Sequence, residues 1–162
     1  DLHSFPTRRS SDLQLAHIFD DKVRAIKAAQ AAGLSVCSGG IMGLGETVED
    51  RIDMALTLRE LGVESVPVNM LNPIPGTPFG NNVRLTNNDM RRIVAVYRFI
   101  LPAASIRLAG GRGLLPDKGK GCFTSGANAA ISGYMLTTAG ITTKIDMELL
   151  NELGYEVKIC NE

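Results

Sequence analysis

The residues best suited to chemistry lie in one run, VCSGGIMGLGET, which extends from Val36 to Thr47. Cys37 ends a short apolar segment, and a cysteine thiolate is a soft ligand suited to iron–sulfur centres. The glycines that follow let a backbone approach a flat ligand closely. Glu46 precedes a predicted helix, where the helix dipole tolerates a negative charge. The run therefore predicts a ligand-binding turn beside a metal-binding thiolate.

Two further loops carry polar groups after predicted strands. Asn69 lies near the end of a strand predicted over 65–70, and the loop NPIPGTP follows at 72–78. Arg107 lies in a strand predicted over 105–109, before Gly110-Gly111-Arg112. We expect a thiolate, a carboxamide and a guanidinium to converge on one face at the carboxyl edge of a sheet, where α/β proteins place their ligands.

Capping patterns indicate where the helices begin. Thr47 with Asp50, Thr86 with Asp89 and Thr143 with Asp146 each have a capping-box spacing. A first helix is predicted from Asp20 or Asp21 to Ala32, and a helical segment over 118–126. The buried face predicted for the helix after Thr86 comprises Ile93, Val96, Phe99 and Ile100.

The order of elements predicts the fold class. Strands predicted over 34–37, 65–70, 105–109 and 129–132 alternate with helices, which indicates βαβ units and a parallel sheet. About four such units make an α/β fold that corresponds to the C-terminal half of a (β/α)8 TIM-type barrel. We assign residues 14–157 to this unit, 1–13 to a disordered, non-native, adapter-like tail, and 158–162 to a second tail.

Composition excludes several classes of partner. The 162 residues include 17 Lys and Arg against 17 Asp and Glu, with no basic cluster, so neither nucleic acid nor a membrane surface is an expected partner. No apolar run approaches the roughly 20 residues of a membrane-spanning helix. Three cysteines are too few and too scattered for a disulfide framework, which favours a reducing, cytoplasmic location.

Several runs resemble a known family. The pattern Gly39-x-Ile41-x-Gly43-x-x-Glu46 is similar to the adenine-side motif of radical S-adenosylmethionine enzymes. The runs at 36–40, 65–72, 106–112 and 122–129 look like the biotin synthase family within that superfamily. The resemblance covers roughly residues 14–157.

The resemblance implies an activity and a set of cofactors. Biotin synthases insert sulfur into dethiobiotin, using a radical made from S-adenosylmethionine at a 4Fe–4S cluster and sulfur from a 2Fe–2S cluster. It further implies an electron-donor protein of the flavodoxin or ferredoxin type and a homodimer. The chain has no CxxxCxxC motif for the 4Fe–4S cluster, so we expect it to be inactive by itself.

The resemblance also implies roles for individual residues. Cys37 and Arg107 would be ligands of the 2Fe–2S cluster, and Asn69 would bind the ureido ring of dethiobiotin. The S-adenosylmethionine side would comprise Gly39, Gly40, Ile41, Gly43, Leu44, Glu46 and Asn72.

Other interpretations of these residues stay open. A related radical enzyme, of the hydrogenase-maturation or methylornithine-synthase type, would keep the adenine motif without needing both Cys37 and Arg107. A non-catalytic α/β module could instead bind phosphate at the turn 39–45. By default Arg107 would pair with a carboxylate, Cys122 would lie in the core, and Cys160 would lie in an exposed tail.

Overall fold

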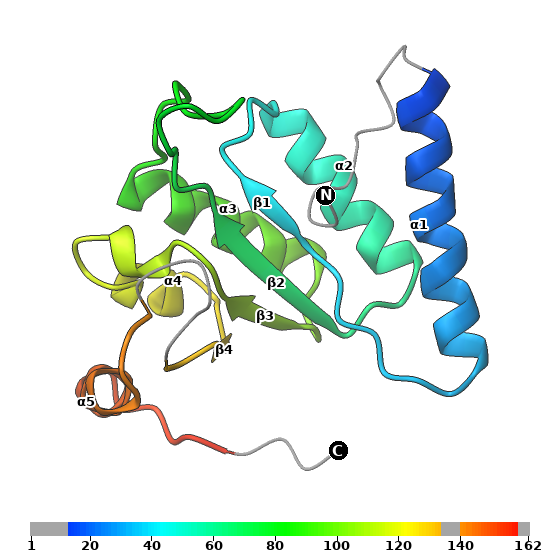
Figure 1. Ribbon diagram of the computed structural model, residues 1–162. Helices are drawn as coiled ribbons and strands as arrows, with labels where there is room; N and C mark the ends of the chain where they lie inside the picture. The colour runs from blue at the N-terminus through cyan, green and yellow to red at the C-terminus, as the bar shows by residue number, and fades with distance from the viewer. Residues whose placement is uncertain (1–12, 134–139, 159–162) are drawn as a thin grey trace.

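The computed structural model describes residues 13–133 and 140–158, with side chains from residue 19 onward. Helices and strands alternate along this part of the chain (Figure 1). The elements are α1 (Leu13–Ala31), β1 (Gly40–Met42), α2 (Val48–Glu60), β2 (Ser65–Met70), α3 (Asn87–Ile100), β3 (Ser105–Leu108), the 3-10 helix η1 (Arg112–Leu114), α4 (Lys120–Thr124), β4 (Ala129–Ala130) and α5 (Thr143–Glu152).

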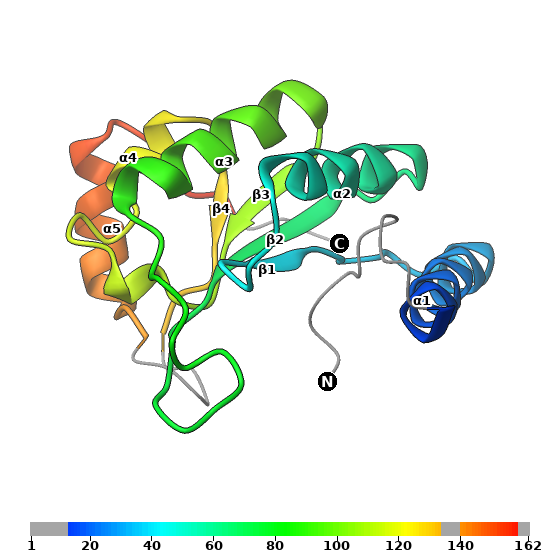
Figure 2. The same ribbon diagram turned by 90° about the horizontal axis from the view of Figure 1, so that it is seen from above.

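The four strands form one parallel sheet in the order β1-β2-β3-β4. Viewed from above, α2 and α3 lie along one face of the sheet, α1 lies beyond β1, and α5 lies beyond β4 (Figure 2). We call the opposite face of the sheet the open face, because neither α2 nor α3 covers it. The predicted α/β class with parallel strands is confirmed.

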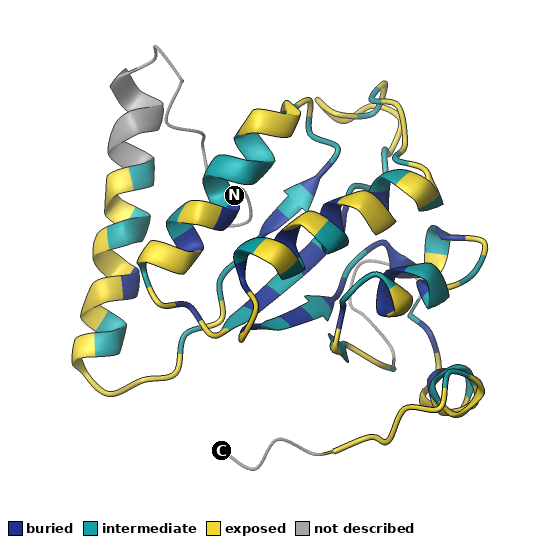
Figure 3. Cartoon of the chain, turned by 180° about the vertical axis from the view of Figure 1, so that it is seen from behind, coloured by how far each residue is buried: buried dark blue, intermediate teal, exposed yellow. Residues whose placement is uncertain are grey.

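The core lies between the sheet and helices α2 and α3. Alternate residues of β2 and β3 point into it, and Leu58 and Tyr97 meet them from the helices. Dark buried positions on the sheet and inner helix faces contrast with exposed outer faces in Figure 3. The face predicted for α3 is partly wrong, since Val96 and Phe99 are 38% and 88% exposed. Its buried residues follow the i, i+3, i+4, i+7 spacing from Met90: Met90, Ile93, Val94 and Tyr97.

Two of the three predicted capping boxes are confirmed. Thr47 with Asp50 and Thr86 with Asp89 each make both reciprocal hydrogen bonds. The third is wrong, because Thr142 caps α5 by accepting from the Ile145 N–H over 3.4 Å. The first helix also begins earlier than predicted, at Leu13, because no glycine or proline interrupts the residues before Asp20.

The first strand is displaced from its predicted position. It comprises Gly40–Met42, whereas Cys37 makes only an isolated bridge to Ser65. Close packing explains the shift: a Cβ on Gly39 would lie 2.0 Å from the Pro67 carbonyl oxygen, and one on Gly40 would lie 2.8 Å from Met54 Sδ. The glycines predicted as a turn therefore allow β1 to approach β2 and α2.

Candidate functional site

The open face brings together the residues predicted to act chemically. Asn69 on β2 pairs with Ile41 on β1, and Arg107 on β3 pairs with Pro67 on β2. These are the half-buried positions of strands whose alternate residues are buried against α2 and α3, so they share the opposite face. The predicted common face agrees with the structure, but the predicted common carboxyl edge is wrong for Cys37, which pairs with the first residue of β2.

Cys37 lies at the amino end of this face. It pairs with Ser65, the first residue of β2, and Ser65 in turn pairs with Ser105. Cys37 is therefore two strand spacings across the sheet from Ser105, and Arg107 lies two residues further along β3. This places the Cα atoms of Cys37 and Arg107 about 12 Å apart. The Cys37 side chain is exposed, and Ser65 Oγ donates to its Sγ over 3.4 Å. Sequence reasoning missed Ser65, because the contact depends on the register between two segments.

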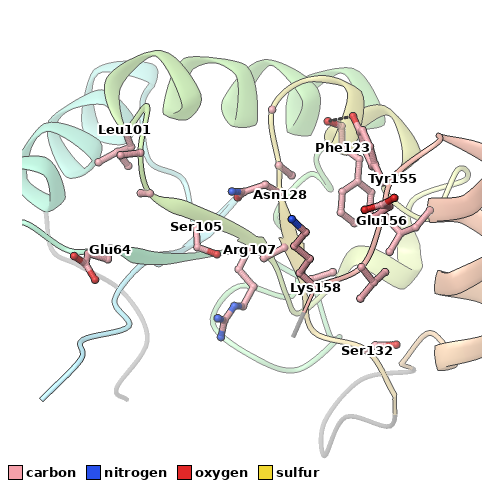
Figure 4. Close-up of a pocket in the computed structure, with 18 of the residues that line it drawn as sticks. Glu64, Leu101, Ser105, Arg107, Phe123, Asn128, Ser132, Tyr155, Glu156 and Lys158 are labelled. Atoms are coloured by element: carbon pink, nitrogen blue, oxygen red, sulfur yellow. Dashed lines mark hydrogen bonds between the residues drawn. The ribbon is translucent and has the colours of Figure 1, made fainter. Parts of the chain in front are cut away.

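Arg107 projects into a cavity of about 1440 Å³ between the β3–β4 side of the sheet and α5 (Figure 4). Within the described residues, no hydrogen bond or ion pair engages its guanidinium. The default expectation of a carboxylate partner therefore finds no support in this part of the chain. Among the predicted site residues only Arg107 lines this cavity, most of whose walls lie at the amino ends of the strands.

Asn69 is held by hydrogen bonds from both neighbouring segments. Its Oδ1 accepts from the Gly110 N–H over 2.9 Å, and its Nδ2 donates to the Gly40 carbonyl over 3.3 Å. A carboxamide has two N–H donors and two lone pairs on oxygen, so one of each is left for a ligand. The side chain can thus present a donor and an acceptor together, in a fixed orientation, above the open face.

The turn after β1 is closed by Glu46. Its Oε1 accepts from the Gly43 N–H and from Arg51 Nε, each over 2.7 Å. Gly43 and Gly45 have φ of +100° and +108°, a region that favours glycine. Oε2 of Glu46 is buried without a partner among the described residues, so it is an acceptor suited to an N–H or O–H group.

The loop after β2 packs against this turn. The Leu71 N–H donates to the Met42 carbonyl over 2.9 Å, which brings Asn72 to the same end of the sheet. Asn82 Nδ2 donates to the Gly43 carbonyl over 2.8 Å, a contact that sequence reasoning missed. Leu44 is half-buried in the turn itself. Of the residues predicted for the S-adenosylmethionine side, Gly43, Leu44, Glu46 and Asn72 therefore lie at the carboxyl ends of β1 and β2, whereas Gly39 and Gly40 lie at the start of β1.

The cysteines differ in exposure. Cys122 is fully buried, as predicted, and burial raises the pKa of its thiol to about 11. Cys160 lies outside the described residues. Within 13–133 and 140–158 no group of three or more His, Cys, Asp or Glu could hold a metal ion. Cys37 and Arg107 would supply at most two ligands of the predicted cluster, so its other ligands would have to come from elsewhere.

A buried ion pair was also missed by sequence reasoning. Arg112 Nη1 and Nη2 donate to Oδ1 and Oδ2 of Asp146 over 2.8 and 2.7 Å, and the two residues are 4% and 5% exposed. This geometry is bidentate and charge-assisted. Asp146 was predicted to cap a helix, and 34 residues separate it from Arg112, so no local pattern could have revealed the pair.

Comparison with known proteins adds three relatives. The chain is 68% identical to the biotin synthase of Brachyspira hyodysenteriae over 143 residues, which are 88% of this chain and 43% of that protein. It is 59% identical to biotin synthase 2 of Corynebacterium diphtheriae over 145 residues, 90% of this chain and 44% of that protein. The biotin synthase of Akkermansia muciniphila is 57% identical over 143 residues, with 88% and 44% covered. The chain thus spans less than half the length of these relatives.

The solved structure of methylornithine synthase superposes with a TM-score of 0.69 at 22% identity, covering 87% of this chain and 46% of that one. This likeness concerns the fold, and it agrees with the prediction that the chain forms about half of a larger α/β unit. No helix of the described residues is long and apolar enough to cross a membrane. The model of the Biotin and Thiamin Synthesis associated domain matches residues 67–156. Since this match covers more than half of the sequence, the chain belongs to the Biotin and Thiamin Synthesis associated domain family.

Proposed function

We propose that the chain is part of a biotin synthase, an enzyme that inserts sulfur into dethiobiotin. The observation that carries the proposal is the placement of Cys37, Asn69 and Arg107 on one open face, with the Arg107 guanidinium free of any partner among the described residues. The names of the relatives support it, at up to 68% identity.

In this proposal Cys37 and Arg107 hold a 2Fe–2S cluster. Thiolate is the usual ligand of such clusters, whereas a guanidinium is ordinarily protonated and paired with anions. The Arg107 guanidinium makes no ion pair in the described part of the chain, so it is available to a group that enters the cavity. Asn69 binds the ureido ring through its remaining N–H and lone pair, since a urea both donates and accepts hydrogen bonds.

The turn after β1 binds S-adenosylmethionine in this proposal. Glu46 Oε2 provides an unpaired buried acceptor, and Ile41 and Leu44 provide apolar contact beside the backbone of Asn72. Gly39 and Gly40 contribute by letting β1 pack closely, and Gly43 contributes by closing the turn. The cofactors supply the radical and the sulfur, and the residues of this chain bind, orient and shield the reacting groups.

Other parts of the proposal concern groups beyond this chain. The 4Fe–4S cluster needs cysteines that the sequence does not contain, so we place its ligands on another segment of the protein and expect the chain alone not to cleave S-adenosylmethionine. An electron-donor protein of the flavodoxin or ferredoxin type, a homodimer and a cytoplasmic location belong to the same proposal.

The phosphate-binding alternative is disfavoured by the charges around the turn. Glu46 accepts the Gly43 N–H that a phosphate would need, and Glu49 and Asp50 occupy the first turn of α2. Three carboxylates at a helix N-terminus repel an anion. The likeness to methylornithine synthase concerns the fold alone, so the joint presence of Cys37 and Arg107 continues to favour the biotin synthase activity over that relative.

A chimera with a known relative tests the proposal without knowledge of the rest of the parent protein. The 143 matched residues of the Brachyspira enzyme would be replaced by those of this chain, and the purified protein would be reconstituted with iron and sulfide. We expect conversion of dethiobiotin to biotin, lost in Cys37→Ala and retained in Cys122→Ala, the matched cysteine control. A folded, reconstituted chimera that makes no biotin, or one whose activity survives Cys37→Ala, would refute the proposed function.

A further inference from the structure

The buried Arg112–Asp146 pair connects α5 to the turn that follows β3. Besides the two bonds to Asp146, the Arg112 guanidinium donates to the Ile131 carbonyl over 3.3 Å and to the Lys118 carbonyl over 3.5 Å. Buried ion pairs add little net stability, because desolvation offsets their attraction, and their best-supported use is to fix one geometry.

The backbone just before Arg112 lies directly against the end of β2. The Gly110 N–H donates to Asn69 Oδ1 over 2.9 Å, and the Gly110 carbonyl accepts from the Met70 N–H over 2.8 Å. Gly111 has φ of +81°, and a Cβ there would lie 2.2 Å from the Met70 carbonyl oxygen. The turn and the strand end are so close that a shift of residues 110–112 must move the Asn69 carboxamide.

Asp146 lies in α5, a helix that contains none of the predicted site residues. This helix lies beyond β4 and apart from α2 and α3 (Figure 1). The path from α5 to the open face is short: Asp146 holds Arg112, Arg112 ends the turn, and Gly110 in that turn holds Asn69. Each step is a hydrogen bond or two residues of backbone.

We propose that the Arg112–Asp146 pair is a positioning device that sets the orientation of the Asn69 carboxamide from α5. In this proposal the pair acts through the backbone, by holding the Gly110 N–H in line with Asn69 Oδ1. The proposal rests on the proposed role of Asn69 in binding dethiobiotin.

The test uses the chimera described above with three variants. Asp146→Asn removes the charge that pairs with Arg112, and the double variant Arg112→Met/Asp146→Leu replaces both partners by apolar side chains, a change that buried pairs often tolerate. Glu152→Gln is the matched control, because Glu152 also joins α5 to α4, through Lys120 on the surface, without contact to the turn. The measurements are thermal unfolding, hydrogen exchange of the peptide containing Gly110, and kcat and KM for dethiobiotin.

We expect the double variant to unfold near the temperature of the unsubstituted chimera. Its KM should nevertheless rise about tenfold at unchanged kcat, the loss expected when one neutral hydrogen bond to the substrate is misaligned. The Gly110 amide should exchange about tenfold faster in both variants of the pair, because its bond to Asn69 opens more often. Glu152→Gln should change none of these values.

A double variant with normal KM and normal exchange at Gly110 would overturn the proposal, because the Asn69 carboxamide would then keep its orientation without the pair. Where Asp146→Asn does not fold, the double variant decides. Where no chimera converts dethiobiotin, the proposed function fails, and the exchange rate at Gly110 still decides whether the pair positions Asn69.

Discussion

Cys37 and Cys122 show how position alone separates two chemically identical side chains. Cys37 lies exposed on the open face, with Ser65 as a donor to its sulfur, whereas Cys122 lies in the short helix α4 and is fully buried. Burial raises the pKa of Cys122 to about 11, because an apolar surrounding disfavours the thiolate. The thiolate is the reactive and metal-binding form, so only Cys37 of these two is chemically available.

This difference predicts selective alkylation of the native chain. At pH 8 iodoacetamide should modify Cys37, while Cys122 should stay unmodified, since a thiol with a pKa near 11 is about one-thousandth ionised there and is also buried. Peptide mapping by mass spectrometry after timed quenching measures both sites. In denaturant the two cysteines should react at similar rates. Equal rates in the native chain would show that α4 does not bury Cys122 as described.

Asp117 is a second residue whose environment has a measurable consequence. Burial by itself raises the pKa of Asp117, but hydrogen bonds from Asn87 Nδ2 and from the N–H groups of Gly121 and Gly119 outweigh it and lower the pKa below 3.8. A carboxylate with a lowered pKa in the folded state stabilises above its unfolded pKa. That stabilisation is lost as the pH falls through the folded pKa.

We therefore expect Asp117→Asn to be less stable than the original chain at pH 7, by about 1 to 2 kcal/mol, because an amide N–H would face hydrogen-bond donors. The difference should shrink as the pH falls below 3.8, where the original carboxylate becomes protonated. Urea unfolding at a series of pH values from 7 down to 2.5 measures it. Asp53→Asn is the control, since no described residue donates to that carboxylate. A difference that is independent of pH would contradict this account.

At the scale of elements, the sequence predicted best where the signal is local. The bounds of β2 and the capping boxes of α2 and α3 follow from alternation and from side chains three residues apart, and all agree with the structure. The position of β1 could not be found in this way. The glycines look like a turn, and only their close contact with Pro67 and Met54, which come later in the chain, shows that Gly39 and Gly40 lie against β2 and α2.

In the candidate site, too, the local features could be predicted and the tertiary contacts could not. Residue types and spacing pointed to Cys37, Asn69 and Arg107, because thiolate, carboxamide and guanidinium after strands are chemically distinctive. The position of Cys37 at the amino end of the open face, the Ser65 donor and the Arg112–Asp146 pair depend on strand register and on segments 28 to 34 residues apart. Such contacts are set by tertiary packing, which no single-sequence pattern records.

The close approach of β1 and β2 gives a prediction at this scale. Gly39→Ala should destabilise the chain by about 3 kcal/mol or more, because its Cβ would lie 2.0 Å from the Pro67 carbonyl oxygen and the strands would have to separate. Gly33→Ala is the control: no atom lies within 4 Å of its Cβ position, so its cost is limited to the roughly 1 to 2 kcal/mol of a left-handed backbone. Chemical denaturation measures both. A Gly39 variant as stable as the Gly33 variant would show that β1 does not pair with β2 in this register.

At the scale of the whole molecule, the open face and the sheet edges decide how the chain behaves by itself. Within the described residues the sheet ends at β1 on one side and at β4 on the other, so both outer strands have unpaired backbone groups. Open strand edges and an uncovered sheet face are sites of association between chains. The chain spans less than half the length of its relatives, so a face that is open here need not be open in the whole protein.

We therefore expect the 162-residue chain to associate in solution at micromolar concentration, with strand edges among the contacts. Ile131→Lys should weaken this association, because Ile131 follows β4, is 41% exposed, and its N–H continues the ladder to the Leu108 carbonyl. A charge at an edge is the usual protection against such pairing. Phe99→Lys is the matched control, since Phe99 is 88% exposed on the outer side of α3, away from both edges. Sedimentation velocity over a concentration series measures the effect, and a monodisperse monomer, or equal weakening by both substitutions, would contradict the edge-pairing account.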